Sequence, residues 1–390
     1  MDWSFLIRNK ESLFVTTDSR KVTSGAVFVA LKGEHFDGND FVDQAKAQGA
    51  EYVICGENAL AELQDLARAW RRELGLPILG ITGTNGKTTT KELCAAVLKT
   101  KYNLYYTQGN LNNQIGVPLT LLSITRAHEM AIVEMGASHP GDIKELVEIA
   151  EPNFGLITNV GKAHLQGFGS FEGVQRTKAE LYEWIVNHGG TIFRNADNPY
   201  LRTMLGNLGN LGHLGNLVEY HTGVMPEGTH LVGGYNAENV SAAICVGRHF
   251  GISEEDALAA IRAYVPSNNR SQFMQTERNT VVVDAYNANP TSMTAAINAF
   301  KGNCYILGAM RELGEYSHLE HQNIVNMLLE RKAEKVLLVG EEYKETTAPY
   351  PIYENVEVLC EALQKDPLSG YNILLKGSRS NQLEKVIPLL

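Results

Sequence analysis

The chain has 390 residues, of which 44% are hydrophobic and 20% are charged, and its formal net charge at pH 7 is −10. This length and balance indicate a globular protein of two or three domains rather than a disordered or fibrous one. The acidic excess argues against a general nucleic-acid binder, and no stretch approaches the roughly 18 consecutive apolar residues that a membrane span needs.

The first block of the chain, residues 1–77, contains short apolar runs that are typical of strands. We predict strands at Ala26–Leu31 and Tyr52–Cys55, with an amphipathic helix at Phe41–Gln48 between them. Pro77 closes this block. The pattern predicts a small α/β domain.

The N-terminal sequence and the cysteines bear on the compartment. The chain begins Met1-Asp2-Trp3, without a basic segment before an apolar core, so we expect no secretory signal. Its five cysteines are widely spaced and form no CxxC pair. Both features favour a cytoplasmic protein with reduced thiols.

The second block, residues 78–268, mixes strand and helix patterns. Strands are predicted at Ile78–Thr82, Met130–Glu134 and Gly155–Thr158. Helical patterns follow Lys87 and Ser170 and cover Asn236–Phe250 and Glu254–Tyr264, the last opened by Ser253 as an N-cap, before a linker at Val265–Asn269.

One segment of this block repeats a Gly-Asn-Leu unit. Gly206–Leu217 carries four glycines in twelve residues, which makes a regular helix unfavourable. We predict a flexible surface loop there and assign it no function.

The third block, residues 269–390, alternates strands with helices. The predicted strands are Val281–Asp284, Cys304–Gly308, Val336–Val339 and Asn372–Lys376, and the predicted helices are Pro290–Phe300, Leu319–Arg331 and Val356–Gln364. Such alternation predicts a parallel sheet covered by helices, with ligands bound at the carboxyl ends of the strands.

The strongest chemical signal is the glycine-rich stretch Gly80–Thr89, which joins a predicted strand to a predicted helix. Glycines let backbone N–H groups converge on phosphate oxygens, and the helix dipole favours negative charge at the same point. Lys87 is expected on the β- and γ-phosphates, and the Thr88 hydroxyl on Mg²⁺. The strict phosphate-loop pattern requires glycine at position 81, where this chain has Ile81, which points away from the common GTPase and ATPase lineages. The alternative is a tight strand–helix turn whose lysine and threonine are incidental.

The stretch Thr82–Thr88 resembles the ATP loop of the Mur ligases and of the related folylpolyglutamate synthetases, which form an amide bond after phosphorylating a carboxylate with ATP. The resemblance implies three domains: a small α/β UDP-binding domain at 1–77, a central ATPase-like parallel-sheet domain at 78–268 and a Rossmann-like domain at 269–390. It implies an ATP site made of Gly83, Thr84, Asn85, Gly86, Lys87, Thr88, Thr89, Asn239, Arg270 and Asp284.

The resemblance also implies Mg²⁺ ligands beyond Thr88. Glu134 ends a predicted strand where the family binds Mg²⁺, and His164 falls where a second Mg²⁺ is bound. Lys178 matches a lysine that is carbamylated into a metal ligand, which requires a neutral, partly buried amine. Taken from the residues alone, the three side chains could instead be a solvated loop carboxylate, a histidine hydrogen-bonded in a loop and a lysine on a solvated helix face.

Three further positions match nucleotide-binding residues of the family. Asn239 is expected to contact the base, Arg270 the γ-phosphate and Asp284 the ribose. Neighbouring Asn236 is expected to be a helix cap. Asp284 could also form an Asx turn before the helix opened by Pro290.

Four segments resemble the family branch that joins UDP-N-acetylmuramoyl-tripeptide to D-alanyl-D-alanine: Thr17–Arg20 with Ala30–Gly38, Thr107–Pro118, Leu307–Glu315 and Leu375–Ser380. The substrate-binding residues that this implies are Ser19, Arg20, Asn110, Asn113 and Arg311. Ala309 stands where the family usually carries an aspartate.

The activity implied is ATP-dependent amide formation through an acyl phosphate in peptidoglycan precursor synthesis, with Lys87, His164, Lys178 and Arg270 as catalytic residues. We expect a cytoplasmic monomer whose partners are small molecules (ATP, a UDP-muramoyl peptide and D-Ala-D-Ala) and whose C-terminal domain closes over ATP. The alternatives are a MurE-like or folylpolyglutamate synthetase-like ligase, or a non-catalytic ATP-binding regulator.

Overall fold

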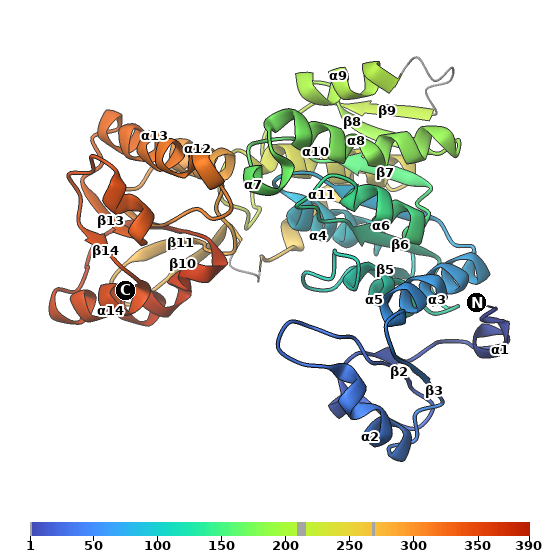
Figure 1. Ribbon diagram of the computed structural model, residues 1–390. Coiled ribbons are helices and arrows are strands. Elements are labelled where there is room, and N and C mark those ends of the chain that lie inside the picture. Colours follow the sequence, from blue (N-terminus) through green and yellow to red (C-terminus); the bar gives the residue numbers. More distant parts are fainter. Residues whose placement is uncertain (1, 209–215, 267–269) are drawn as a thin grey trace.

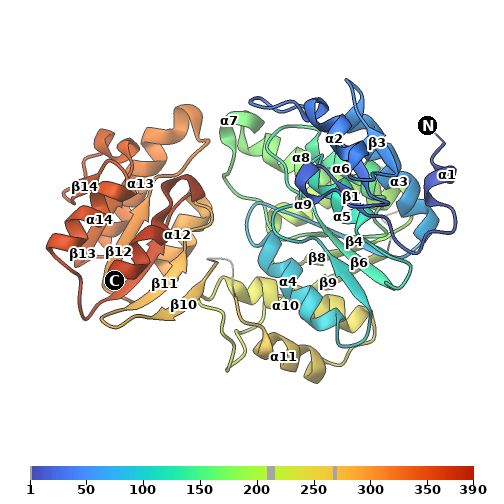
Figure 2. The same cartoon turned by 90° about the horizontal axis from the view of Figure 1, so that it is seen from below.

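The computed structural model describes residues 2–208, 216–266 and 270–390, and the strands of these residues form three sheets (Figure 1). Each sheet is built from one stretch of the chain and is accompanied by helices from the same stretch. The α/β class and the parallel sheets predicted from the sequence are confirmed. Seen from below, the C-terminal sheet and its helices lie to one side of the remainder (Figure 2).

The smallest sheet is parallel and has the order β1-β2-β3. Its strands are β1 (Val15–Thr16), β2 (Val27–Val29) and β3 (Tyr52–Ile54). The helical elements of this stretch are α1 (Ser4–Ile7), η1 (Ser19–Lys21), η2 (Gly38–Phe41), α2 (Val42–Ala47) and α3 (Ala59–Leu74). The predicted strands are therefore present but shorter, and the predicted helix at Phe41–Gln48 corresponds to α2.

The long helix α3 has no counterpart in the elements predicted above. Its apolar residues Leu63, Leu66 and Trp70 follow a helical spacing and are buried in one core with residues of the central sheet. Trp70 Nε1 donates a hydrogen bond of 2.8 Å to the Ile124 carbonyl. The hydrophobic core thus continues across residue 77, so the proposed boundary at 77/78 marks a change of sheet rather than a gap in packing. The proposed boundary at 268/269 lies outside the described residues.

The central sheet is entirely parallel, with the order β5-β6-β4-β7-β8-β9. Its strands are β4 (Ile78–Thr82), β5 (Leu104–Tyr106), β6 (Met130–Glu134), β7 (Phe154–Ile157), β8 (Thr191–Asn195) and β9 (Asn216–Tyr220). Its helices are α4 (Lys87–Leu98), α5 (Gly116–Leu122), α6 (Asp142–Ala150), α7 (Leu165–Phe168), α8 (Phe171–Asn187), α9 (Pro199–Leu208), α10 (Asn236–His249) and α11 (Glu254–Ala263).

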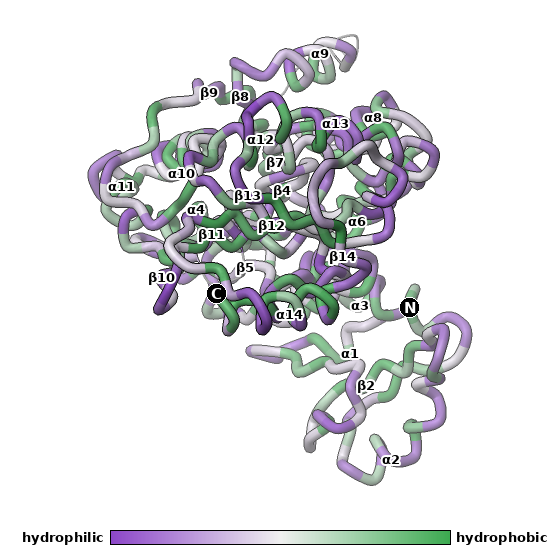
Figure 3. Tube along the Cα trace, turned by 90° about the vertical axis from the view of Figure 1, so that its left-hand side faces the viewer, coloured by the Kyte–Doolittle hydropathy of each residue, from purple (hydrophilic) through white to green (hydrophobic). Residues whose placement is uncertain are grey.

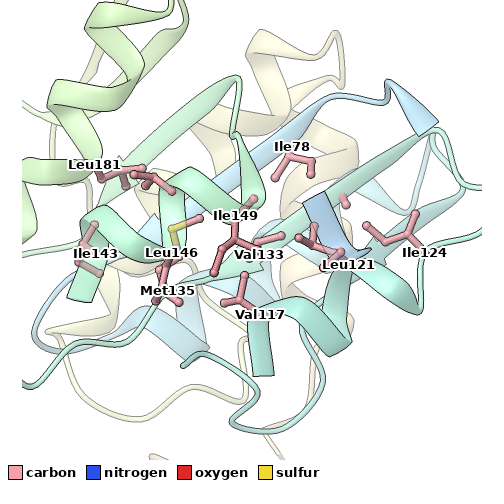
Figure 4. Close-up of a cluster of buried hydrophobic side chains, with 14 of the residues drawn as sticks. Ile78, Val117, Leu121, Ile124, Val133, Met135, Ile143, Leu146, Ile149 and Leu181 are labelled. Atoms are coloured by element: carbon pink, nitrogen blue, oxygen red, sulfur yellow. The ribbon is translucent and has the colours of Figure 1, made fainter. Parts of the chain in front are cut away.

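Helices cover both faces of this sheet because successive strand residues point to opposite sides. On one face Ala131 and Val133 pack with α3, α5, α6 and α8. Figure 4 shows Val133 of this cluster among side chains of α5 and α6. On the other face Met130 and Ile132 pack with α4, α10 and α11. Both sides of β4 and β6 are therefore buried, which explains their continuous apolar sequences.

The predicted surface loop at Gly206–Leu217 is partly wrong. Residues 206–208 form the last turn of α9, and Asn216 and Leu217 begin β9, while residues 209–215 lie outside the described residues. Leu217 pairs with Ile192 of β8, so sheet hydrogen bonding outweighs the low helix and strand propensity of the repeat.

The C-terminal sheet has the order β10-β11-β15-β12-β13-β14. Its strands are β10 (Gln272–Gln275), β11 (Thr280–Asp284), β12 (Cys304–Gly308), β13 (Lys335–Val339), β14 (Ile352–Tyr353) and β15 (Asn372–Lys376). Its helical elements are α12 (Pro290–Ala299), η4 (Gly314–Tyr316), α13 (Ser317–Glu330), η5 (Glu341–Glu345), α14 (Val356–Lys365), η6 (Arg379–Asn381) and η7 (Leu383–Leu389).

This sheet is parallel except for β10, which pairs antiparallel with β11 and was not predicted. The strands β11 and β12 are largely hydrophobic, whereas hydrophobic and hydrophilic residues alternate along α14 (Figure 3). One face of the sheet packs against α12 and α13, and the other against α14 and η7.

Candidate active site

A pocket of about 870 Å³ opens where the carboxyl ends of central strands meet the C-terminal sheet. β4 lies between β6 and β7, so the strand order reverses beside it, and such a switch point is where open α/β sheets bind ligands. Of the residues predicted from the sequence, the pocket is lined by Thr84, Asn85, Gly86, Lys87, Thr88, Thr89, Asn110, Asn113, Glu134, His164, Asn239, Arg270 and Asp284.

The glycine-rich loop between β4 and α4 forms one wall of the pocket. Gly83 and Gly86 have φ values of +144° and +79°, which side-chain-bearing residues rarely adopt. A Cβ at Gly83 would lie 2.0 Å from Thr158 Oγ1, and one at Gly86 would lie 2.5 Å from Asn239 Oδ1. Both glycines are therefore required by the backbone and by close packing.

Lys87 is the first residue of α4 and folds back over this loop. Its ammonium group donates hydrogen bonds to the carbonyls of Gly83 (2.7 Å) and Thr84 (3.0 Å). Burial lowers the pKa of Lys87 to about 8, against the opposing influence of Glu134. A bound phosphate would favour the charged form and offer the ammonium an anionic partner.

Thr88 and Glu134 form the most suitable Mg²⁺ site in the pocket. Thr88 Oγ1 donates to Glu134 Oε1 at 3.2 Å, and octahedral Mg²⁺ with ligands at about 2.1 Å holds neighbouring oxygens about 3 Å apart. Glu134 Oε1 also accepts from Asn112 Nδ2 at 2.9 Å. Glu134 Oε2 is buried without a hydrogen-bond partner among the described residues, with Lys91 Nζ at 3.7 Å. These hard oxygens fit Mg²⁺, which would be held by both in place of the hydrogen bond between them.

Within the described residues, no group of three or more His, Cys, Asp or Glu side chains is arranged to hold a metal ion. Few protein ligands are typical of Mg²⁺ sites that take their remaining ligands from substrate phosphates and water. The arrangement is therefore that of a nucleotide-dependent site rather than a protein-only metal centre.

His164 caps α7 in a left-handed conformation with φ of 49° and directs Nδ1 to the Glu312 carboxylate. Burial lowers the pKa of His164, although Glu312 acts in the opposite direction. Glu312 reaches the pocket from the loop after β12, so this contact joins the central and C-terminal sheets.

Lys178 lies on α8 and is buried, with 2% of its surface exposed. Burial, followed by the nearby charge of Lys87, holds its pKa well below the usual value. The solvated helix face that the residues alone would suggest is therefore wrong. Lys178 does not line the pocket among the described residues, and its Nζ lies 5.7 Å from the centre of the Phe168 ring.

Arg270 and Asp284 bring C-terminal side chains to the pocket. The Arg270 guanidinium stacks 3.8 Å from the centre of the Tyr286 ring, and its buried Nε has no hydrogen-bond partner among the described residues. Asp284 ends β11 and accepts a hydrogen bond of 2.6 Å from the buried Lys376. α12 is capped by Asn289, which forms a capping box with Ser292, so the cap of this helix does not come from Asp284.

Asn239 is buried against the nucleotide helix. Its Oδ1 accepts from Thr90 Oγ1 at 2.9 Å, and its Nδ2 donates to Asn236 Oδ1 at 2.9 Å. The prediction that Asn236 caps α10 is wrong: Tyr235 is the N-cap residue, and Asn236 Nδ2 donates instead to the Val232 carbonyl at 2.8 Å.

The predicted substrate-binding residues fall in different places. Asn110 and Asn113 line the pocket, and Asn113 Oδ1 also accepts from the Gly116 N–H at 2.8 Å at the start of α5. Ser19 and Arg20 lie in η1 beside the small sheet, where Arg20 pairs with Asp18. Arg311 lies after β12 and pairs with Glu342. The last three do not line this pocket.

The structure adds residues that were not singled out from the sequence. Asn112 holds Glu134, Tyr286 stacks on Arg270, Lys376 holds Asp284, and Glu312 meets His164. Asn112, Glu312 and Lys376 lie inside segments that resemble the Mur ligases, and Tyr286 lies two residues after Asp284, but nothing in their spacing shows which side chains they contact.

Comparison with known proteins is consistent with this arrangement. Residues 12–96 match the "Mur ligase family, catalytic domain" model, residues 81–214 the "Mur ligase middle domain" and residues 269–379 the "Mur ligase, glutamate ligase domain". The UDP-N-acetylmuramoyl-tripeptide–D-alanyl-D-alanine ligases of Bacillus subtilis and Escherichia coli are each 32% identical, over 96% of this chain and 92% and 93% of their own length. The crystal structure of MurF ligase from Thermotoga maritima in complex with ADP has a TM-score of 0.85 and 27% identity, over 98% of each chain.

Proposed function

Because the chain belongs to the Mur ligase family, we propose that it adds D-alanyl-D-alanine to UDP-N-acetylmuramoyl-tripeptide in an ATP-dependent reaction of peptidoglycan synthesis. The observation that carries the proposal is the phosphate loop at the switch point of the central sheet. There Lys87 and the Thr88–Glu134 pair face Arg270 and Asp284 across one pocket.

The proposed chemistry has two steps. A carboxylate at neutral pH is a poor electrophile, so its oxygen first attacks the γ-phosphorus of ATP, forming an acyl phosphate and releasing ADP. The amine of D-Ala-D-Ala then attacks the acyl carbon, loses a proton and expels phosphate as the amide forms. Positioning and electrostatic stabilisation supply most of the rate in such transfers.

The residues of the pocket are suited to those tasks. The loop N–H groups and Lys87 would bind the β- and γ-phosphates, and the unpartnered Nε of Arg270 would reach the transferred group. Asp284 would hold the ribose, and Asn239 would lie on the side of the base. Thr88 and Glu134 would hold Mg²⁺, which neutralises phosphate charge when bound.

His164 and Lys178 are proposed to serve a second Mg²⁺. Lys178 is buried, and its lowered pKa favours the neutral amine that reacts with CO₂ to form a carbamate. Asn110 and Asn113, together with Ser19, Arg20 and Arg311, are proposed to bind the UDP-linked peptide and the dipeptide. Ser19 and Arg20 belong to η1 beside the small sheet, whereas Asn110 and Asn113 line the pocket, so a substrate that contacts all four would span both parts.

The location and assembly state are part of the proposal. No helix of the described residues is long and apolar enough to cross a membrane. All five cysteines are free, which agrees with a reducing compartment. We propose a cytoplasmic monomer.

The reaction is tested by measuring ADP release with ATP, Mg²⁺ and a panel of acids and amines, with the product identified by mass spectrometry. We expect turnover only when a UDP-muramoyl tripeptide and D-Ala-D-Ala are both present. Lys87→Ala should lower the rate by about 10³-fold, the scale of losing a charge-stabilising donor. Binding of the UDP-peptide should survive in this variant.

Other outcomes would separate the alternatives. Turnover with a UDP-muramoyl dipeptide and diaminopimelate would identify a MurE-like enzyme, and turnover with a folate acid would identify a folylpolyglutamate synthetase-like one. ATP binding without any amide product would identify a non-catalytic regulator.

A further inference from the structure

A pair of side-chain amides joins the phosphate loop to the C-terminal sheet. Asn289 Nδ2 donates to Asn85 Oδ1 at 2.8 Å, and Asn85 Nδ2 lies 3.4 Å from Asn289 Oδ1. Asn85 is in the glycine-rich loop, and Asn289 immediately precedes α12, 204 positions later in the chain. The Asn85 side chain therefore faces the C-terminal sheet, while its backbone belongs to the loop.

Each of the two asparagines is also held by hydrogen bonds within its own part of the chain. Asn289 is buried, its Oδ1 accepts from the Ser292 N–H at 2.9 Å, and its own N–H donates to Ser292 Oγ at 3.1 Å. On the other side, the Asn85 N–H donates to Asn159 Oδ1 at 3.0 Å, and the Asn85 carbonyl accepts from Thr158 Oγ1 at 2.6 Å. The amide pair thus joins two segments that other hydrogen bonds already hold in place, so its formation costs little conformational entropy.

The position of Asn289 determines where the C-terminal nucleotide groups lie. Asp284 and Tyr286 precede Asn289 in one short segment between β11 and α12, and Tyr286 carries Arg270 on its ring. α12 lies on the side of the C-terminal sheet that faces the central part of the chain (Figure 1). The amide pair therefore fixes the start of this helix against the phosphate loop. A shift at the amide pair would move Asp284 and Arg270 relative to the phosphates.

Other contacts hold the same helix without touching the phosphate loop. The Lys162 N–H donates to Thr291 Oγ1 at 3.0 Å, and Lys162 Nζ pairs with the buried Glu320 of α13 at 2.7 Å. These contacts also join the central and C-terminal parts, but on the central side they involve the loop after β7. They therefore serve as a comparison for the amide pair.

We propose that Asn85 and Asn289 are positioning residues that set the C-terminal nucleotide groups against the phosphate loop. The inference rests on the proposed function for its catalytic part. An amide suits this role because each side chain supplies a donor and an acceptor without charge. A carboxylate at either position would place negative charge beside the phosphates.

The test is a double-mutant cycle with Asn85→Ala, Asn289→Ser and the double variant. Serine keeps the helix cap but is too short to keep both amide contacts. Each single variant should weaken ADP binding, measured by calorimetry without turnover, by about tenfold, and should lower kcat by a similar factor. The double variant should be no worse than the single ones, because both changes remove one shared interaction.

Glu320→Gln is the matched control, and it should change ADP affinity less than threefold. Thermal unfolding of every variant shows whether the fold is kept. If Asn289→Ser does not fold, Asn289→Thr keeps an uncharged helix cap and removes the Nδ2 donor.

Two results would overturn the proposal: wild-type ADP affinity and kcat in both single variants, or effects in the double variant that equal the product of the single ones. A failure of the proposed function gives a different result. In that case the wild-type protein would not couple D-Ala-D-Ala, whereas the ADP-binding cycle would still report on the amide pair.

Discussion

At the scale of single residues, Lys87 and Lys178 have different surroundings. Lys87 contacts two loop carbonyls and is opposed by Glu134, so it retains partners for its charged form. Lys178 is buried near the Phe168 ring, and burial and the charge of Lys87 lower its pKa against the opposing charges of Asp142 and Glu180. The first is suited to bind phosphate as a cation, and the second to react as a neutral amine.

We therefore predict that Lys178 takes up CO₂. Wild-type protein in ¹³C-bicarbonate should show a carbamate signal by NMR that is absent from Lys178→Met. The variant should lose about 10²-fold in activity, the scale of a lost metal-site ligand. Lys144→Met, which changes an exposed lysine, is the control and should keep both the signal and the activity. A wild-type protein that is fully active in CO₂-depleted buffer and gives no signal would contradict the prediction.

Most of the site residues predicted from the sequence line the pocket, but their contacts were not predicted. Lys87, Thr88 and Glu134 follow apolar strands, so the topology of a parallel sheet brings them together wherever the helices lie. The cap assigned to Asn236 failed because the sequence does not show at which residue the helical hydrogen bonds of α10 begin. In the structure Tyr235 is the N-cap residue, and its side chain makes no capping hydrogen bond.

At the scale of elements, the loop after β12 is fixed by a buried histidine of α13. His321 Nε2 accepts from the Met310 N–H at 3.0 Å, while Nδ1 lies 2.7 Å from the Ser317 carbonyl and so carries the proton. The ring packs edge-on against Tyr343. Met310 begins the segment that carries Arg311 and Glu312, so the neutral ring holds this segment in place.

Burial lowers the pKa of His321 in the folded protein. The unfolded chain therefore binds a proton more readily below about pH 6.5, and stability is lost as the pH falls from there toward the folded pKa. We predict that His321→Phe, which cannot accept from Met310, is less stable at pH 7.5 by about 1–3 kcal/mol. In thermal unfolding, the stability difference between this variant and the wild type should be smaller at pH 5.5. Only the wild type has an imidazole at position 321 whose protonation favours the unfolded state. A deficit that stays constant between the two pH values would contradict this assignment.

Strands whose residues are nearly all buried were predicted best. Ile78–Thr82, Met130–Glu134, Cys304–Gly308 and Asn372–Lys376 are buried on both faces, and their bounds agree with the structure. β10 was missed because it is a short edge strand whose residues Gln272–Gln275 show no polar–apolar alternation, and its pairing depends on β11. The segment at 206–217 was misassigned at its ends because β9 is stabilised by β8, a contact that local composition does not reveal.

At the scale of the whole molecule, the site is shared between two sheets that have separate cores. The phosphate loop belongs to the central sheet, while Asp284, Tyr286 and Glu312 come from the C-terminal part of the chain. The contacts that join the two parts are mostly polar, such as Asn85 with Asn289 and Lys162 with Glu320. Polar contacts of this kind separate at lower cost than an apolar core, so relative motion of the two parts is expected.

We predict that this motion is part of each turnover. A compact chain of this length has a radius of gyration of about 21 Å, and an open arrangement of the three domains has a larger one. Small-angle scattering should therefore show the radius falling toward that value when a non-hydrolysable ATP analogue and the UDP-peptide are added together, because ATP binds groups from both parts. Lys87→Ala should show a much smaller change with the same ligands, since the phosphates lose their central anchor while the UDP-peptide can still bind. An unchanged radius in the wild type, with binding verified by calorimetry, would show that the site is already assembled before substrates arrive. The amide pair at Asn85 and Asn289 would then maintain a permanent arrangement instead of forming in each cycle.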